Sequence, residues 1–262
     1  MKFANVLAAA GVTAGCTLLG LGTTGVASAQ STGTQTYMAT LKPVPLNGQN
    51  SASGTLTLTL NGDVATVHET VSGLASTFMG KPFPHVQHIH GGADGTCPTA
   101  ANDTNHDGVI STVEGQNTYG AVQTTLSVTG STAPSAATDV TIAPSGSSYT
   151  YDRTITLSPQ SLADIQQGNA VIVVHGLDPA TAPQAATTEK SPLVPSLPLA
   201  ATAPALCGSL VASQMSAVPT GGAQTGGGST TGVQDIGLIV AGGASLAAGA
   251  GLFASRRLRH SA

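Results

Sequence analysis

The residues of this chain that could bind metal ions are concentrated between His85 and Glu114. Histidines stand at positions 85, 88 and 90, and a series of acidic and amide residues begins at Asp103. Imidazole nitrogen is a common ligand for copper, zinc and iron, whereas calcium prefers carboxylate and carbonyl oxygen. The segment therefore predicts two neighbouring metal sites with different chemistry.

Residues 103–114 match the twelve-residue EF-hand loop, in which oxygen ligands alternate, glycine is sixth and glutamate twelfth. Neither flank shows apolar residues at helical spacing, so we expect a loop without paired helices that stiffens this segment. The alternative is a surface turn that satisfies its own backbone. The expected calcium ligands are Asp103, Asn105, Asp107, the carbonyl group of Val109, Ser111 through a water, and Glu114.

A second site is predicted at His88 and His90, which are two residues apart and would leave a strand from the same face. His175 ends an apolar run and is the expected distant third ligand. Three imidazoles suit copper and zinc equally, so the sequence leaves this choice open. The alternative is that these histidines are ordinary structural residues.

The remaining histidines are expected to have other roles. His85 lies three residues before His88 and would face the other way, so we expect it to support the ligands rather than bind. His68 and His106 could each supply a fourth nitrogen, but both are expected to face solvent.

The rest of the body must provide the elements that position these residues. Thr- and Val-rich segments of alternating polarity, separated by Gly, Pro, Asn or Ser, are typical of an antiparallel sandwich or barrel. Asn61-Gly62 predicts a tight hairpin, and residues 170–174 predict a central strand. A helix is expected at residues 158–167, starting at Ser161 with Asp164, and an extended loop at 179–204. The expected alternating strands are residues 53–60, 63–70, 120–128, 138–143 and 148–157.

Charge and cysteine content limit the function classes. Residues 30–232 contain eleven acidic and four basic side chains, a net charge of minus seven, which argues against binding of nucleic acid or anionic lipid by the body. Cys97 and Cys207 remain as an even pair once an N-terminal leader is removed, and a disulfide is expected in an oxidising compartment.

The first residues predict export from the cytoplasm. Lys2, an apolar stretch and Ala27-Ser28-Ala29 form a secretory signal peptide at residues 1–29, so the mature chain is expected to begin near Gln30. A lipoprotein site at Cys16 is the alternative.

The last residues predict a membrane anchor. Residues 214–235 form a flexible linker, residues 236–254 an uncharged stretch long enough to cross a bilayer, and residues 255–262 a basic cytoplasmic tail. The expected location is therefore the cell surface, with the body outside. A cell-wall sorting signal is the alternative, although no LPxTG-type motif precedes the stretch.

Several short motifs, read in order along the chain, resemble those of the copper/zinc superoxide dismutases. They are His85-x-x-His88-x-His90, Cys97, Val173-Val174-His175 and Leu206-Cys207-Gly208. The run His88-Ile89-His90-Gly91-Gly92-Ala93 is also similar to the signature of chordin-type (CHRD) domains. The resemblance covers most of residues 35–213 and implies a Greek-key antiparallel β-sandwich. It also implies copper binding by His88, His90 and His175, and a structural disulfide between Cys97 and Cys207.

The chain departs from the dismutase pattern at two places. Asp103 stands where that family has the histidine that bridges copper and zinc, and Pro204 stands where it has the arginine that guides superoxide. Loss of that cation weakens the attraction of an anion. We therefore expect a surface-anchored, calcium-binding and copper- or zinc-binding module. A copper-only superoxide dismutase and a non-catalytic adhesion or scaffold module are the alternatives.

Overall fold

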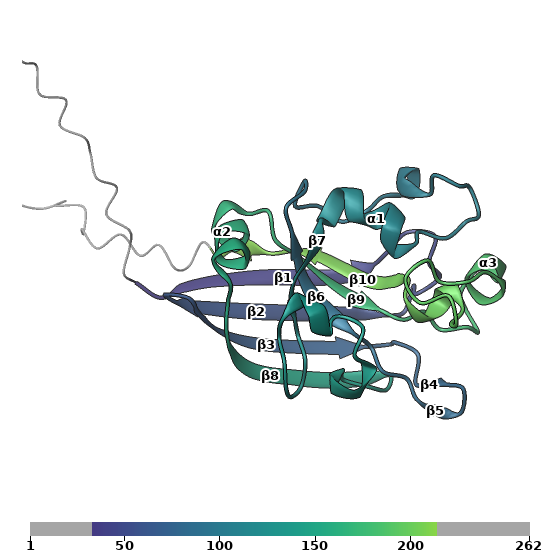
Figure 1. The fold of residues 1–262 in the computed structure, drawn as a ribbon, viewed down its shortest axis with the longest axis horizontal. Coiled ribbons are helices and arrows are strands. Elements are labelled where there is room, and N and C mark those ends of the chain that lie inside the picture. Colours follow the sequence, from purple (N-terminus) through teal and green to yellow (C-terminus); the bar gives the residue numbers. More distant parts are fainter. Residues whose placement is uncertain (1–32, 214–262) are drawn as a thin grey trace, which may run out of the picture. The chain divides into compact units, whose positions relative to one another are not determined.

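The computed structural model describes residues 33–213, and these form one curled antiparallel β structure (Figure 1). The helices are α1 Thr112–Tyr119, α2 Pro159–Gln167 and α3 Gln184–Thr188, with 3-10 turns at Ala100–Asn102, Pro134–Ala136, Val140–Ile142 and Leu199–Ala201. The strands are β1 Gln35–Pro43, β2 Ser53–Asn61, β3 Val64–Ser72, β4 Thr77–Phe78, β5 Lys81–Pro82, β6 Gln87–Gly91, β7 Ala121–Thr125, β8 Ser148–Thr156, β9 Val171–His175, β10 Pro204–Ser209 and β11 Val211–Ala212.

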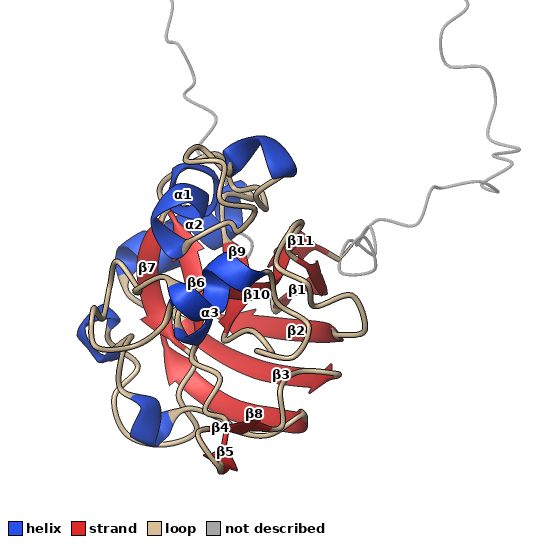
Figure 2. Ribbon diagram, turned by 90° about the vertical axis from the view of Figure 1, so that its right-hand side faces the viewer, coloured by secondary structure: helices blue, strands red, loops and turns tan. Residues whose placement is uncertain are grey.

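The main sheet has the strand order β7-β6-β9-β10-β1-β2-β3-β8. Strand β1 joins its two halves, because its first part pairs with β2 and its last two residues pair with β10. The sheet curls so that the halves face each other (Figure 2). The Tyr149 hydroxyl of β8 donates to Gln87 Oε1 of β6 at 2.8 Å, which joins the two halves across the interior.

A single apolar core fills the inside of the curled sheet. Strand β3 alternates exposed and buried residues along its whole length, as a strand with one face on a core should. Residues from both halves meet there, among them Leu56 and Val67 opposite Ile89 and Ile172. The strands predicted at residues 53–60, 63–70 and 148–157 are therefore confirmed as β2, β3 and β8, and each has one face on the core.

The hairpin predicted at Asn61-Gly62 is present, with its turn shifted by one residue. Asn61 pairs with Val64, so the two-residue loop is Gly62-Asp63. Gly62 has a φ of 64°, the positive value that a type II′ turn requires at its first central position. The turn thus depends on the glycine.

Strands β6 and β9 are buried on both faces and lie next to each other in the sheet. Their inward side chains, such as Ile89 and Ile172, join the main core. On the outer face, Val171 and Val173 pack with Tyr119 of α1 and with Cys207 in a second, smaller cluster. Segments outside the sheet therefore cover this face, and the histidines lie beneath them.

Expectations about local structure were wrong in several segments. The strand expected at residues 138–143 is absent, and a 3-10 turn at Val140–Ile142 takes its place, because the Asp139 side chain accepts a hydrogen bond from the Thr141 amide and turns the chain. The loop expected at residues 179–204 contains α3, whose Ala186 is buried. Helix α2 confirms the predicted position, but its cap is Ser158 rather than Ser161, since the Ser158 hydroxyl accepts from the Ser161 amide.

Several predictions concern residues outside the described range. The signal peptide at residues 1–29, Cys16, the linker, the span at 236–254 and the basic tail all lie there. Within residues 33–213, no helix is both long enough and apolar enough to cross a membrane.

Candidate metal centre

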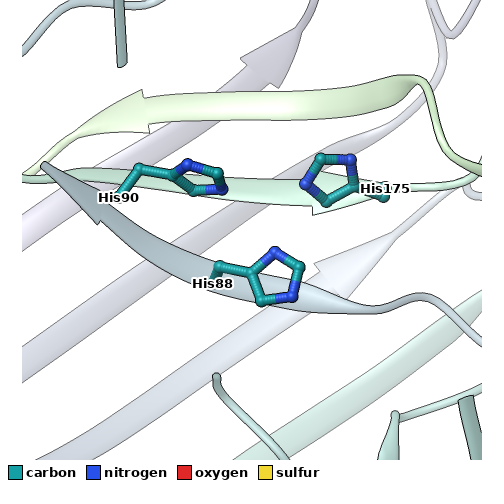
Figure 3. A group of neighbouring side chains, drawn as sticks. All are labelled: His88, His90 and His175. Carbon is teal, nitrogen blue, oxygen red and sulfur yellow. The ribbon is translucent and has the colours of Figure 1, made fainter. Parts of the chain in front are cut away.

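The sheet brings the three predicted histidine ligands together. His88 and His90 leave β6 from its outer face, and His175 ends the neighbouring strand β9 (Figure 3). The antiparallel register places His88 opposite Val173, so His175 stands one diagonal step away on the same face. One ring nitrogen from each histidine lies within 4.8 Å of the others. The prediction that His175 joins the pair is therefore consistent with the fold.

Each imidazole is held through one ring nitrogen by a backbone carbonyl. His88 Nε2 donates to the Ala137 carbonyl at 3.0 Å, and His90 Nδ1 donates to the Gly120 carbonyl at 2.9 Å. His175 Nδ1 donates to the Thr202 carbonyl at 2.8 Å. Because a carbonyl oxygen only accepts, the proton of each neutral imidazole sits on the anchored nitrogen.

The opposite nitrogens are free to act as ligands. His88 Nδ1, His90 Nε2 and His175 Nε2 are buried and have no hydrogen-bond partner. A buried polar atom without a partner usually costs about 1–3 kcal/mol, so three in one place require a physical explanation. A shared metal ion provides one.

The electrostatics keep the three imidazoles neutral. Burial, followed by the neighbouring histidines, lowers the pKa of His88 well below its usual range and that of His90 to about 3. Burial lowers the pKa of His175 to about 4. Neutral imidazoles present lone pairs at neutral pH, which is the state that a metal ion requires.

The nitrogens are close enough to share one ion after the side chains move together. Nitrogens bound to one tetrahedral zinc ion at about 2.0–2.1 Å lie about 3.4 Å apart. The separation of up to 4.8 Å seen here would therefore close by up to about 1.4 Å on binding, a change that three side chains can share. The donor set, its anchoring hydrogen bonds and its burial therefore fit a copper or zinc ion.

Helix α1 holds His90 from one side. The Tyr119 ring packs against the His90 ring with centroids 4.6 Å apart, and the next residue, Gly120, supplies the anchoring carbonyl. Gly120 has a φ of 84°, and a Cβ there would lie 2.0 Å from the Gly91 carbonyl oxygen. Only glycine fits at this contact between the helix end and β6.

His85 is outside the three-histidine group and contacts the backbone of His175. Its Nδ1 contacts the backbone carbonyl of His175 at 2.9 Å, and its Nε2 contacts the Ala75 carbonyl at 2.9 Å. It is fully buried and does not belong to the three-histidine group. His68 is exposed and pairs with Asp152, and His106 is also exposed, so neither supplies a fourth nitrogen.

A cavity of about 330 Å³ opens directly onto the three histidines. Its wall is mostly apolar, and none of the described residues that line it is Asp, Glu, Lys or Arg. Pro204, at the position where the resembling enzymes have a guiding arginine, does not line it. The wall includes Phe83, Val86, Val122, Leu193, Val194 and Leu197.

The predicted calcium loop forms a compact turn around inward-facing carboxylates. The Asp103 carboxylate accepts hydrogen bonds from the amides of Asp107 and Gly108, at 3.2 and 3.0 Å. Both carboxylate oxygens of Glu114 accept hydrogen bonds from Ser111 and Thr104. Burial raises the pKa of Glu114, but these hydrogen bonds outweigh it, and the net pKa is lowered.

The flank after this loop differs from expectation. Residues 112–119 form α1, although we expected no helix there. Ser111 caps it through the Glu114 amide, and the Glu114 side chain returns to the Ser111 amide, a capping box that starts a helix without an apolar stripe. Before the loop, a three-residue 3-10 turn stands in place of an entering helix.

The predicted disulfide is present. Cys97 and Cys207 are bonded, with Cα atoms 5.7 Å apart, and join residues 110 apart in the sequence. The bond fastens the segment before the loop to β10, the neighbour of β9.

Sequence reasoning did not identify a second buried polar cluster, on the inner face of the sheet. Glu69 of β3 is fully buried, and neither of its carboxylate oxygens has a hydrogen-bond partner. Burial raises the pKa of Glu69 to about 8, whereas the nearby side chain of Gln87 acts to lower it. The hydroxyl of Tyr151, its partner in register on β8, is also buried without a hydrogen bond. A lone glutamate in an alternating strand is the only sequence signal of this cluster.

Comparison with known proteins assigns no family. No protein-family model matches the sequence, and no curated protein is significantly similar to it. The geometry of the site itself must therefore carry the functional argument.

Proposed function

We propose that this protein is a cell-surface β-sandwich module of dismutase-like or CHRD-like type that binds a copper or zinc ion and is stabilised by calcium. The single observation that carries the proposal is the arrangement of His88, His90 and His175. Each has one nitrogen anchored by a backbone carbonyl and the other buried without a partner. A purely structural adhesion or scaffold module would leave these three nitrogens without a role.

Removing one ligand tests the transition-metal site. In calorimetric titration with copper or zinc, His175→Ala should weaken binding by at least about 100-fold, since losing even an outer-shell partner of a ligand costs 10–100-fold. His68→Ala is the matched control, because His68 is exposed and outside the group. Equal affinity in the protein and in His175→Ala would reject the site.

Calcium binding is proposed for the loop at residues 103–114. It is supported by the oxygen donors at the EF-hand positions and by the carboxylates of Asp103 and Glu114, which face the loop's own amides. Calcium binds the folded protein, so saturation at 100 times the dissociation constant adds about 2.7 kcal/mol to the free energy of unfolding. A melting temperature that is the same with calcium and with chelator, in the protein and in Asp103→Ala, would reject this role.

A copper-only superoxide dismutase is the alternative enzyme function. A copper ion held by three imidazoles would supply one-electron redox chemistry. The uncharged lining of the cavity argues against guided entry of an anion, however. The test is superoxide removal by the copper-loaded protein against His88→Ala at the same copper content. Equal rates would reject the dismutase.

The location outside the cytoplasm is part of the same proposal. It is supported by the Cys97–Cys207 bond, since disulfides persist in oxidising compartments. It also relies on the signal peptide and membrane span predicted at the two ends of the sequence, which would leave the metal sites exposed to the external medium.

A further inference from the structure

The cavity in front of the three histidines is larger than the binding of a metal ion alone requires. An ion bound there needs only a few cubic ångströms beyond the nitrogens, whereas the cavity holds about 330 Å³. That volume lies at the lower end of the range for small-molecule pockets. The space is therefore large enough for an organic molecule of modest size next to the ion.

The cavity wall determines which molecules would gain by entering. Aromatic and branched aliphatic side chains form most of it, among them Phe83, Val194 and Leu197. No described lining residue carries a charge that could compensate the lost hydration of an ionic ligand. An apolar body, in contrast, gains free energy in proportion to the area that it buries.

The floor and the mouth of the cavity determine how a ligand would contact the ion and where it would enter. The floor is formed by His88, His90 and His175, whose free nitrogens would leave an ion with open coordination positions on the cavity side. The mouth includes Val140 and Leu193, which are 49 % and 48 % exposed and come from separate loops. A ligand can thus enter between these loops and reach the ion with one donor atom.

We propose that the cavity binds a neutral small molecule that has an aromatic or branched aliphatic body and one neutral nitrogen or oxygen donor directed at the metal ion. This inference rests on the proposed metal binding by the three histidines, and names the class of ligand that the site takes. It differs from the dismutase alternative, because a small anion would leave the apolar wall without a partner.

The test compares three probes on the copper-loaded protein, after removal of excess copper. They are imidazole, 4-phenylimidazole and the charged analogue 4-(4-carboxyphenyl)imidazole. Binding is followed by the visible absorption of copper and by calorimetry, so that no activity measurement is needed. We expect 4-phenylimidazole to bind at least about tenfold more tightly than imidazole, because the wall covers its ring. The charged analogue should lose this advantage.

A variant pair locates the effect in the cavity. Val140→Asp introduces a charge at the mouth and should reduce the advantage of 4-phenylimidazole over imidazole at least about threefold. Val211→Asp is the control, since Val211 is also an exposed valine but does not line the cavity. An equal reduction in both variants would overturn the assignment to this cavity.

The two proposals fail in different ways in this experiment. Copper affinity that is unchanged in His175→Ala would reject the metal site, whatever the probes do. Copper affinity that depends on His175, together with equal binding of imidazole and 4-phenylimidazole, would preserve the metal site and overturn the apolar-ligand inference.

Discussion

The loop at residues 103–114 and the three-histidine group differ in whether their polar atoms have hydrogen-bond partners. In the loop, the carboxylates of Asp103 and Glu114 accept hydrogen bonds from amides and hydroxyls within the loop itself, at most ten residues away. In the histidine group, three nitrogens remain without partners, and the anchoring carbonyls come from distant parts of the chain. The carboxylates of the loop are thus satisfied from within it, although the Asn47 side chain also holds the backbone of Ile110. The histidine site, in contrast, depends entirely on residues that the fold brings together.

The two regions are nevertheless connected. Helix α1 starts inside the loop at Thr112, contains Glu114 and ends at Tyr119, whose ring packs on His90. The disulfide from Cys97 fastens the segment before the loop to β10. Perturbing helix α1 or the disulfide tests whether the loop at residues 103–114 and the three-histidine group are independent.

Loss of the disulfide should have the largest effect. By the chain-entropy model, a bond that joins residues 110 apart stabilises the fold by about 4–5 kcal/mol as an upper estimate. The double variant Cys97→Ser, Cys207→Ser should therefore unfold at clearly lower denaturant concentration. The measurement is equilibrium unfolding in urea, with the protein under reducing conditions as the second arm. An unchanged midpoint in both arms would contradict the expectation.

Glu69 should make stability fall with rising pH. Its pKa is raised by burial to about 8, above the unfolded value of 4.5, so the folded state binds an extra proton between these values. Each pH unit in that window then lowers the free energy of unfolding by on the order of 1 kcal/mol, and the loss is complete above pH 8. Tyr149 and Tyr151 of β8 remain neutral there, because burial raises the pKa of both above the usual value.

The variant Glu69→Gln isolates this effect, because glutamine imitates the protonated carboxyl. The difference in unfolding free energy between Glu69→Gln and the protein should grow from pH 5 to pH 8, while contributions of other groups cancel. Glu189→Gln is the matched control, since Glu189 is exposed. A difference that stays constant over this range would show that Glu69 does not titrate in this window.

The smallest expected effect is the coupling between the two proposed metal sites. If calcium orders the loop and α1, it also positions Tyr119 and Gly120 against His90. Chelating calcium should then weaken copper binding about fivefold, at the lower end of typical coupling between sites. Calorimetric copper titrations with and without calcium measure this effect, and Asp103→Ala should abolish it. Identical copper affinities would establish that the local loop and the assembled site are independent.

Several features could be predicted from the sequence because they depend on near neighbours. The alternation of polarity predicted the strands β2, β3 and β8, and Asn61-Gly62 predicted a hairpin. The pattern from Asp103 to Glu114 predicted a compact loop, although the capping box that begins α1 was not recognised. Short-range hydrogen bonding and strand periodicity are visible in sequence because their partners lie within a few residues.

Only the tertiary structure decided the rest. It placed His175 beside His88 and His90, and it supplied their anchors from the carbonyls of Ala137, Gly120 and Thr202. A backbone carbonyl belongs to every residue, so no side-chain pattern can reveal which one will hold an imidazole. The uncharged cavity and the unpartnered carboxylate of Glu69 likewise arise from segments far apart in the sequence, which meet only when the sheet curls.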